Sequence, residues 1–464
     1  MAWHIKGRRG QEREEQAADA AEAHRVLTLA DISGLSAKDH HTDLKVDIHQ
    51  SLLDRINLAA LETMTRDQIH REIGELVHEQ LSNRKHALNS SERRQLVDDI
   101  LDELLGLGPL EPLLKDPTIT DVLVNSHKTV FVERFGVLEE TAARFKDEKH
   151  LMRVISKIVS AVGRRVDESS PMVDARLEDG SRVNAIVPPL AVDGALLSIR
   201  KFAKIPISMD RLCEIGSIAP EIAEVLKAVV MCRRNVLISG GTGSGKTTLL
   251  NALSAYIDNR ERIVTIEDSA ELQLQQRHVA RLETRPPNIE GRGEVTQRDL
   301  VKNALRMRPD RIIVGEVRSG EAFDMLQAMN TGHDGSMTTV HANTSRDALS
   351  RVEQMIGMSG IDIPPRSARA QIASALNIVV QIERSVDGRR RLVSVSELTG
   401  MEGEVITMQE IFRFKRTSMD AEGRVVGHYE ASGIRPKFID VAAAYGVRLP
   451  VELFAPDRKL GAAA

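Results

Sequence analysis

Residues 235–250 read Asn235-Val-Leu-Ile-Ser-Gly-Gly-Thr-Gly-Ser-Gly-Lys-Thr-Thr-Leu-Leu250, and this stretch decides the fold. It begins like a buried strand, continues as a glycine loop and ends like the start of a helix. Residues 240–247 match G-x-x-x-x-G-K-[S/T] at every fixed position. Because the glycines let the backbone turn its N–H groups inward around phosphate oxygens, we expect a nucleotide here rather than a plain turn.

The side chains of this loop have separate expected roles. Lys246 would reach the β- and γ-phosphates of ATP, and the hydroxyl of Thr247 would bind Mg²⁺. The following helix would direct its positive end at the anion. The candidate nucleotide-binding residues of the loop are Gly240, Gly241, Thr242, Gly243, Ser244, Gly245, Lys246, Thr247 and Thr248.

Two carboxylates follow further strand-like runs. The runs 263–266, 311–314 and 337–340 alternate with helical segments, which predicts a doubly wound, mostly parallel sheet that binds ligands at the carboxyl ends of its strands. Glu267 follows the first run and would position the attacking water or hold hydrated Mg²⁺; an N-cap by Asp268 is the structural alternative. Glu316 follows the second run and is the predicted general base.

The metal candidates are Thr247, Glu267 and Glu316. Gly315 stands where a Walker B strand usually has an aspartate, which weakens the prediction that this strand coordinates Mg²⁺ directly. His333 and His341 flank the third run and would sense the γ-phosphate or link neighbouring sites; a structural histidine is the commoner alternative. They do not form a zinc pair, because no cysteine accompanies them.

Arginines are candidates for stabilising charge that develops on the transferred phosphate, an effect of about 10³–10⁵ in rate when the group is well placed. Arg176, Arg182 and Arg200 lie in a predicted strand region, and Arg281, Arg285 and Arg292 lie after Glu267. Most arginines of any chain are solvated surface residues, so each one is an individual hypothesis.

The composition argues against several classes of protein. The 464 residues carry a net charge of −4, which does not favour nucleic-acid binding, and two cysteines are typical of a reducing cytosol. No apolar run approaches 18 residues, so we expect a cytoplasmic chain without a membrane span.

The predicted organisation has five parts. Residues 1–40 are a mobile tail, 41–106 a three-helix bundle, 107–202 an α+β domain with an antiparallel sheet, 203–218 a linker and 219–464 an α/β domain with the P-loop.

Taken in order, the P-loop, Thr265-Ile-Glu-Asp268, Gly315-Glu-Val-Arg318 and the histidine segment 331–344 resemble the four boxes of the type II/IV secretion ATPase superfamily. The stretches 107–114 and 281–288 are similar to its CpaF branch, which drives Flp-type (tight adherence) pili. The four-cysteine zinc module of the type II secretion and type IVa assembly enzymes is missing from this sequence.

The resemblance implies a homohexamer with an N-terminal sheet domain and a C-terminal RecA-like motor that hydrolyses ATP with Mg²⁺. It implies that Glu316 and Glu267 surround the hydrolytic water, that Arg176, Arg182 and Arg200 are candidates for completing the site, and that inner-membrane platform proteins are partners. The resemblance further implies that ATP hydrolysis drives assembly of the pilus, together with its retraction. The alternatives are a type IV secretion or conjugation ATPase, an archaeal filament motor, a nucleotide-dependent scaffold and a nucleic-acid motor.

Overall fold

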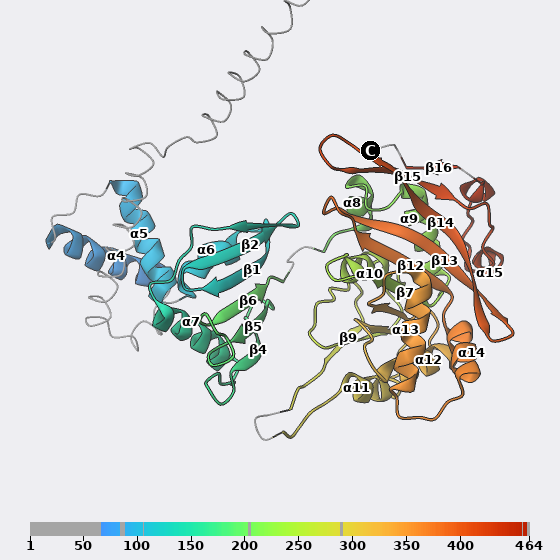
Figure 1. Cartoon of the computed structure of the whole chain (residues 1–464), viewed down its shortest axis with the longest axis horizontal. Helices are drawn as coiled ribbons and strands as arrows, with labels where there is room; N and C mark the ends of the chain where they lie inside the picture. Colours follow the sequence, from blue (N-terminus) through green and yellow to red (C-terminus); the bar gives the residue numbers. More distant parts are fainter. Residues whose placement is uncertain are drawn as a thin grey trace, which may run out of the picture. The chain divides into compact units, whose positions relative to one another are not determined.

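The computed structural model describes residues 66–83, 89–104, 106–202, 206–287, 291–456 and 458–461. The chain divides into two compact units, one built mainly from residues before Arg200 and one mainly from Arg200 onward. Figure 1 labels their elements. The predicted mobile tail and the first predicted helix of the bundle lie outside the described residues. No helix within these ranges is long and apolar enough to cross a membrane.

The first unit starts with two helices, α4 (Arg66–Asn83) and α5 (Ser90–Leu104). Ile73, Leu96 and Ile100 are fully buried in the core that these helices share. Apolar residues spaced by three to four positions lie on one stripe of each helix, which is why the sequence predicts both helices. A short η1 (Gly108–Leu110) and α6 (Glu111–Lys115) follow.

A six-stranded sheet completes the first unit in the order β3-β2-β1-β6-β5-β4. The strands are β1 (Ile119–Ser126), β2 (Thr129–Arg134), β3 (Val137–Glu140), β4 (Met172–Arg176), β5 (Arg182–Ile186) and β6 (Leu196–Arg200). Asp147 caps α7 (Glu148–Ala161) by accepting a bond from the N–H of His150. The α+β prediction is confirmed, and β3 is a strand that the sequence pattern does not predict.

The second unit is built on a ten-stranded sheet in the order β16-β15-β14-β13-β12-β7-β11-β10-β8-β9. Six strands pair in parallel: β7 (Val236–Gly240), β8 (Ile263–Glu267), β9 (Val279–Glu283), β10 (Arg311–Val314), β11 (Met337–Val340) and β12 (Ile378–Arg384). The P-loop strand β7 lies between β12 and β11. The predicted RecA-like α/β fold is confirmed.

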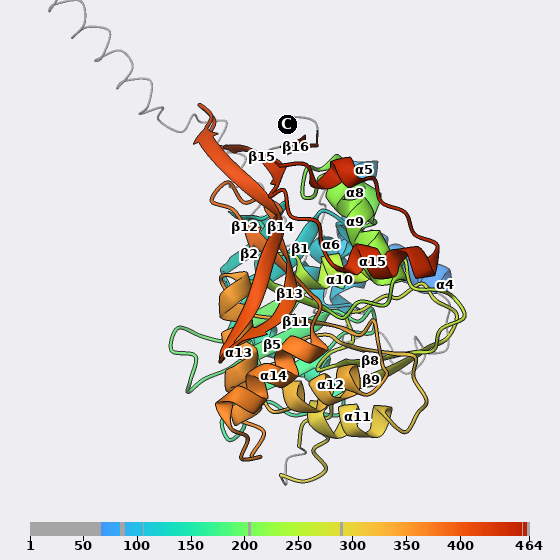
Figure 2. The same ribbon diagram turned by 90° about the vertical axis from the view of Figure 1, so that its right-hand side faces the viewer.

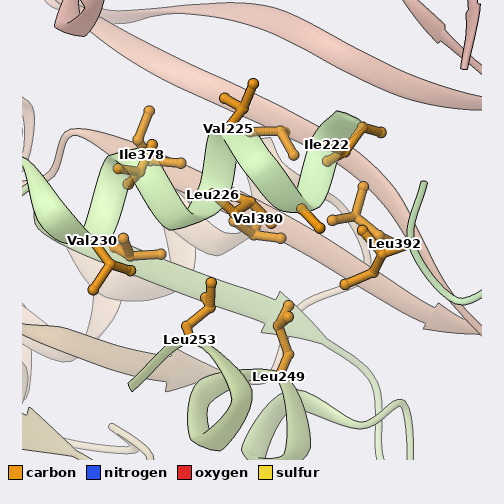
Figure 3. Close-up of a cluster of buried hydrophobic side chains, with 14 of the residues drawn as sticks. Ile222, Val225, Leu226, Val230, Leu249, Leu253, Ile378, Val380 and Leu392 are labelled. Atoms are coloured by element: carbon orange, nitrogen blue, oxygen red, sulfur yellow. The ribbon is translucent and has the colours of Figure 1, made fainter. Parts of the chain in front are cut away.

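Helices cover both faces of this sheet. On one face, α9 (Pro220–Met231) and α10 (Lys246–Ser254) share a core with Val236 and Ile238 of β7, and Figure 3 shows side chains of this core. On the other face, Leu237 packs with residues of α11 (Gln297–Ala304), α12 (Glu321–Asn330), α13 (Ser345–Gly357) and α14 (Pro365–Ala375). Because successive strand residues point to opposite faces, a continuous apolar run suits a strand buried on both sides.

Two features differ from the predictions. The expected linker 203–218 contains a helix, α8 (Met209–Glu214), whose Met209 and Leu212 are buried in the core with α9. Burial of two apolar residues in so short a segment ties it to the core of the second unit, so this part of the predicted linker is a packed helix. The other domain boundaries stay predictions.

The second difference is an antiparallel extension of the sheet, which the sequence pattern does not predict. It consists of β13 (Arg390–Glu402), β14 (Val405–Met419), β15 (Val425–Ala431) and β16 (Lys459–Leu460), which pair in sequence from β12 onward. Figure 2 shows the long strand β14 along one side of this unit. The remaining elements are α15 (Phe438–Ala442), η2 (Ala443–Tyr445) and η3 (Val451–Phe454).

Candidate active site

Four neighbouring parallel strands bring the predicted polar residues to one edge of the sheet. Ser239 of β7 is level with Val340 of β11, and Val314 of β10 is level with both Thr338 of β11 and Ile266 of β8. The residues that follow these strands are therefore neighbours, namely the P-loop, Glu267, Glu316 and His341. The carboxyl edge of a parallel sheet is where such folds bind ligands.

The P-loop needs its glycines for two different reasons. Gly243 (φ +68°) and Gly245 (φ +97°) have left-handed backbone conformations, which residues with a β-carbon rarely adopt. A β-carbon on Gly240 would overlap the carbonyl oxygen of Ile382 on the adjacent strand β12. The loop can therefore approach β12 closely and lead directly into α10, whose first residue is Lys246.

Lys246 lies deep in the loop. Its Nζ donates to the carbonyl oxygens of Gly240 and Gly241, each at 3.0 Å, and lies 3.3 Å from Nε2 of His341. Desolvation of the nearly buried ammonium lowers the pKa of Lys246, while the charge of Glu316 opposes this shift. The cation is held between the P-loop and the ends of β10 and β11, where a phosphate group on the loop would meet it.

Glu316 is held by an arginine and lies against a histidine, although its Oε1 makes no hydrogen bond among the described residues. Its Oε1 lies 3.0 Å from Nε2 of His341, and its Oε2 accepts a hydrogen bond from Arg318 Nη2 at 2.8 Å. Arg318 also donates to Asp268 Oδ2 at 2.9 Å, so one guanidinium links two strand ends. Burial lowers the pKa of His341, which makes its ring neutral at neutral pH and able to accept or donate a proton.

Glu267 occupies a buried position with one satisfied oxygen. Its Oε1 accepts hydrogen bonds from the N–H groups of Glu271 and Leu272, both at 2.9 Å. Its Oε2 is buried and has no hydrogen-bond partner among the described residues. Desolvation raises the pKa of Glu267 to about 7, so its carboxyl can hold or release a proton near neutral pH.

The oxygen donors here fit Mg²⁺. Thr247 at the start of α10 supplies a hydroxyl, and the unpaired Oε2 of Glu267 supplies a carboxylate oxygen. Within the described ranges, no three or more His, Cys, Asp or Glu side chains are grouped to hold a metal by themselves. Mg²⁺ usually keeps several waters and is bound jointly by one or two protein groups and substrate phosphates.

Two cavities adjoin the cluster. One of about 380 Å³ borders Gly241, His341 and the α13 residues Asp347 and Arg351. The other, of about 330 Å³, borders Thr242, Glu316, Arg318, His341 and Arg351. The predicted P-loop, Glu316 and His341 thus line adjoining spaces, and Arg351 is common to both.

His333 is not brought to this cluster. It precedes β11, whose opposite end carries His341, and its Nδ1 lies 3.1 Å from the carbonyl oxygen of Ala328. A strand with one histidine before and one after it separates them to opposite edges of the sheet. The prediction that His333 binds nucleotide is therefore not supported within one chain.

The predicted arginines of the first sheet lie at strand ends: Arg176 ends β4, Arg182 begins β5 and Arg200 ends β6. Their catalytic or nucleotide-binding roles stay predictions. Arg318 and Arg390, which contact the site, are not among the residues predicted from the sequence. Arg318 could have been found two residues after Glu316, whereas Arg390 has no local signal that connects it with the P-loop.

A parallel sheet flanked by helices, with a phosphate-binding loop after a central strand, defines the class of RecA-like P-loop proteins. Residues 103–423 match the model of the family described as "Type II/IV secretion system protein". The chain belongs to this family.

Relatives extend the comparison. A putative conjugal transfer protein of Mycobacterium tuberculosis is 41% identical over 310 residues, which cover 65% of this chain and 87% of the relative. The conjugal transfer protein TrbB of Rhizobium radiobacter is 34% identical over 314 residues, covering 67% and 90%. The crystal structure of the VirB11 ATPase from the Brucella suis type IV secretion system, in complex with sulphate, is 29% identical, covers 62% of this chain and 94% of that chain, and has a TM-score of 0.34.

Proposed function

We propose that this chain is a secretion or conjugation ATPase of the VirB11/TrbB type, which hydrolyses ATP to drive transport through a membrane apparatus. The observation that carries the proposal is the cluster at the P-loop: His341 Nε2 lies 3.3 Å from Lys246 Nζ and 3.0 Å from Glu316 Oε1. One imidazole thus lies between a cation for phosphate and a carboxylate for water. The names of the relatives favour conjugation and secretion over the pilus function that the CpaF resemblance implies.

The chain's own groups have distinct roles in this proposal. The inward N–H groups of residues 241–247 and the Lys246 ammonium bind the phosphates. Glu316 orients the attacking water and accepts its proton, while Arg318 holds the carboxylate and His341 lies against its other oxygen. Thr247 and Glu267 would hold Mg²⁺, which would supply charge that offsets the negative charge of the phosphates.

Assembly is part of the proposal. A homohexamer would allow arginines of a neighbouring copy to complete each site, with Arg176, Arg182 and Arg200 as candidates. Inner-membrane platform proteins would be the partners that receive the work, and the chain would act at the cytoplasmic side of that membrane. Nucleic acid is not an expected partner, because the net charge is −4.

A second candidate is assembly of a Flp-type pilus, as in the CpaF branch. The segments 107–114 and 281–288, which are similar to that branch, favour it. Co-purification from the native cell distinguishes the two clients: a conjugation or secretion apparatus supports the first proposal, and a prepilin with its platform proteins supports the second.

Phosphate release by the purified chain tests the chemistry. Lys246→Ala should abolish binding of a non-hydrolysable ATP analogue, and Glu316→Gln should bind the analogue but hydrolyse ATP at least about 100-fold more slowly. Lys302→Ala is the matched control, because Lys302 is an exposed lysine of α11 in the same unit. Normal turnover by both site variants would refute the proposal.

A further inference from the structure

The hairpin between β12 and β13 lies beside the P-loop. Ile382 of β12 is level with Gly240 at the end of β7, so the residues after Ile382 continue past the start of the loop. A buried ion pair stabilises the hairpin: Arg391 donates to the two carboxylate oxygens of Asp387 at 3.0 and 2.8 Å. Asp387 Oδ2 also accepts the N–H of Val425 at 3.0 Å, which ties the hairpin to β15.

Arg390, the first residue of β13, reaches from this hairpin to the P-loop. Its Nε donates a hydrogen bond to the carbonyl oxygen of Gly243 at 2.9 Å. Its Cδ lies 3.5 Å from the position of a β-carbon on Gly245, so its side chain also packs against the end of the loop. The donor is a charged guanidinium, which makes this bond stronger than one between two neutral groups.

This bond sets the direction of one peptide plane. In a trans peptide the C=O of Gly243 and the N–H of Ser244 point in opposite directions. With the carbonyl directed at Arg390, the Ser244 N–H points across the loop and donates to the Gly241 carbonyl oxygen at 3.4 Å. A phosphate bound in the loop would replace this carbonyl as the acceptor of the Ser244 N–H.

Gly243 makes the same plane easy to turn over. It has φ +68° and no β-carbon, so the barrier that a side chain would impose on a flip of the adjoining peptide is missing. A flipped plane would direct the Gly243 carbonyl oxygen toward the phosphates and repel them. An external donor on that carbonyl therefore selects the arrangement that binds phosphate.

We propose that Arg390 is a positioning residue that holds the P-loop in its phosphate-binding conformation by fixing the Gly243–Ser244 peptide. The inference rests on the proposed function, since it concerns how the same loop binds ATP. Arg390 acts through the loop backbone. Its loss therefore weakens capture of the nucleotide, and a saturating nucleotide restores the loop geometry.

The test compares Arg390→Ala with Arg389→Ala, which removes the same charge from the neighbouring, exposed position of the hairpin. For Arg390→Ala we expect the Kd of a non-hydrolysable ATP analogue and the KM for ATP to rise about tenfold, with kcat within about threefold of wild type. Arg389→Ala should stay within about twofold in all three quantities. Arg390→Lys, which keeps a cationic donor, should recover most of the affinity.

Three results separate the possible failures. Equal Kd values for the Arg390→Ala and Arg389→Ala variants would overturn the role of Arg390 and leave the P-loop function intact. A lowered Tm together with loss of kcat in Arg390→Ala would also overturn it, because the residue would then be structural. A wild-type chain that binds no ATP analogue would refute the proposed function itself.

Discussion

A β-carbon on Gly315 would lie 2.9 Å from the Cγ atom of Glu267. The glycine after β10 therefore leaves room for a carboxylate that arrives from the end of the neighbouring strand β8. A Walker B strand usually carries its acidic residue at this position. In this protein β8 supplies the carboxylate and β10 supplies the space for it, which explains why an aspartate is not found at position 315.

Gly315→Ala should lower the kcat for ATP hydrolysis by at least about tenfold, because the added methyl group displaces Glu267 from its place beside the end of β10. Binding of an ATP analogue should change little. Gly357→Ala, at the end of α13 where a β-carbon meets nothing within 4 Å, is the control. Unchanged hydrolysis in Gly315→Ala would show that the position of Glu267 does not matter for turnover.

His341→Ala should lower kcat about tenfold or more with little change in KM, because Glu316 loses the imidazole that lies 3.0 Å from its Oε1. His333→Ala is the matched control, since that histidine lies before the same strand and away from the cluster. Steady-state phosphate release measures kcat and KM for both variants. An equal loss in His333→Ala would contradict its placement outside the site and restore the prediction from the sequence.

Asp387→Asn should destabilise the chain by about 2 kcal/mol at pH 7, because hydrogen bonds from Arg391 to the carboxylate weaken. Those bonds hold the pKa of Asp387 well below its usual range, so its stabilising contribution is present above about pH 4 and is lost as the pH falls further. Urea unfolding at pH 7 and pH 3 should show that the difference in unfolding free energy between wild type and variant is smaller at pH 3. A constant difference would exclude this ion pair as its cause.

Arg311→Ala should lower the free energy of unfolding by about 3 kcal/mol, because the buried carboxylate of Glu261 loses the guanidinium that neutralises it. Arg311 is 1% exposed and donates to both oxygens of Glu261 at 2.7 and 2.9 Å. Arg233, 3.1 Å from Glu261, limits the loss by remaining as a partner. Chemical denaturation measures the effect, and a double variant with Arg311→Met and Glu261→Leu should be more stable than Arg311→Ala alone.

The predictions from sequence succeed where the signal is local or where topology converts it into proximity. The P-loop is contiguous, and Glu267, Glu316 and His341 each lie at or just after the carboxyl end of a strand, so the rule for parallel sheets places them at one edge. The prediction for His333 fails, because a residue before a strand and a residue after it lie at opposite edges of the sheet. Only the residue at the carboxyl end belongs to the edge that binds ligands.

The features that the sequence does not predict depend on distant partners. Arg390 contacts a residue 147 positions earlier in the chain, and nothing in the sequence around either residue indicates the pairing. The register of β13 and β14 is likewise set by pairing with other strands rather than by local preference. The segment of α8 resembles a linker in sequence, because its two buried apolar residues have meaning only against α9 and α10.

The close approach of Gly240 to Ile382 has a practical consequence for mutagenesis of this protein. Replacing that glycine would force apart two central strands at their junction, so an inactive Gly240 variant would report a damaged scaffold and say nothing about phosphate binding. A substitution that shortens Lys246 adds no atoms at the crowded junction. It is therefore the cleaner way to abolish nucleotide binding while keeping the fold intact.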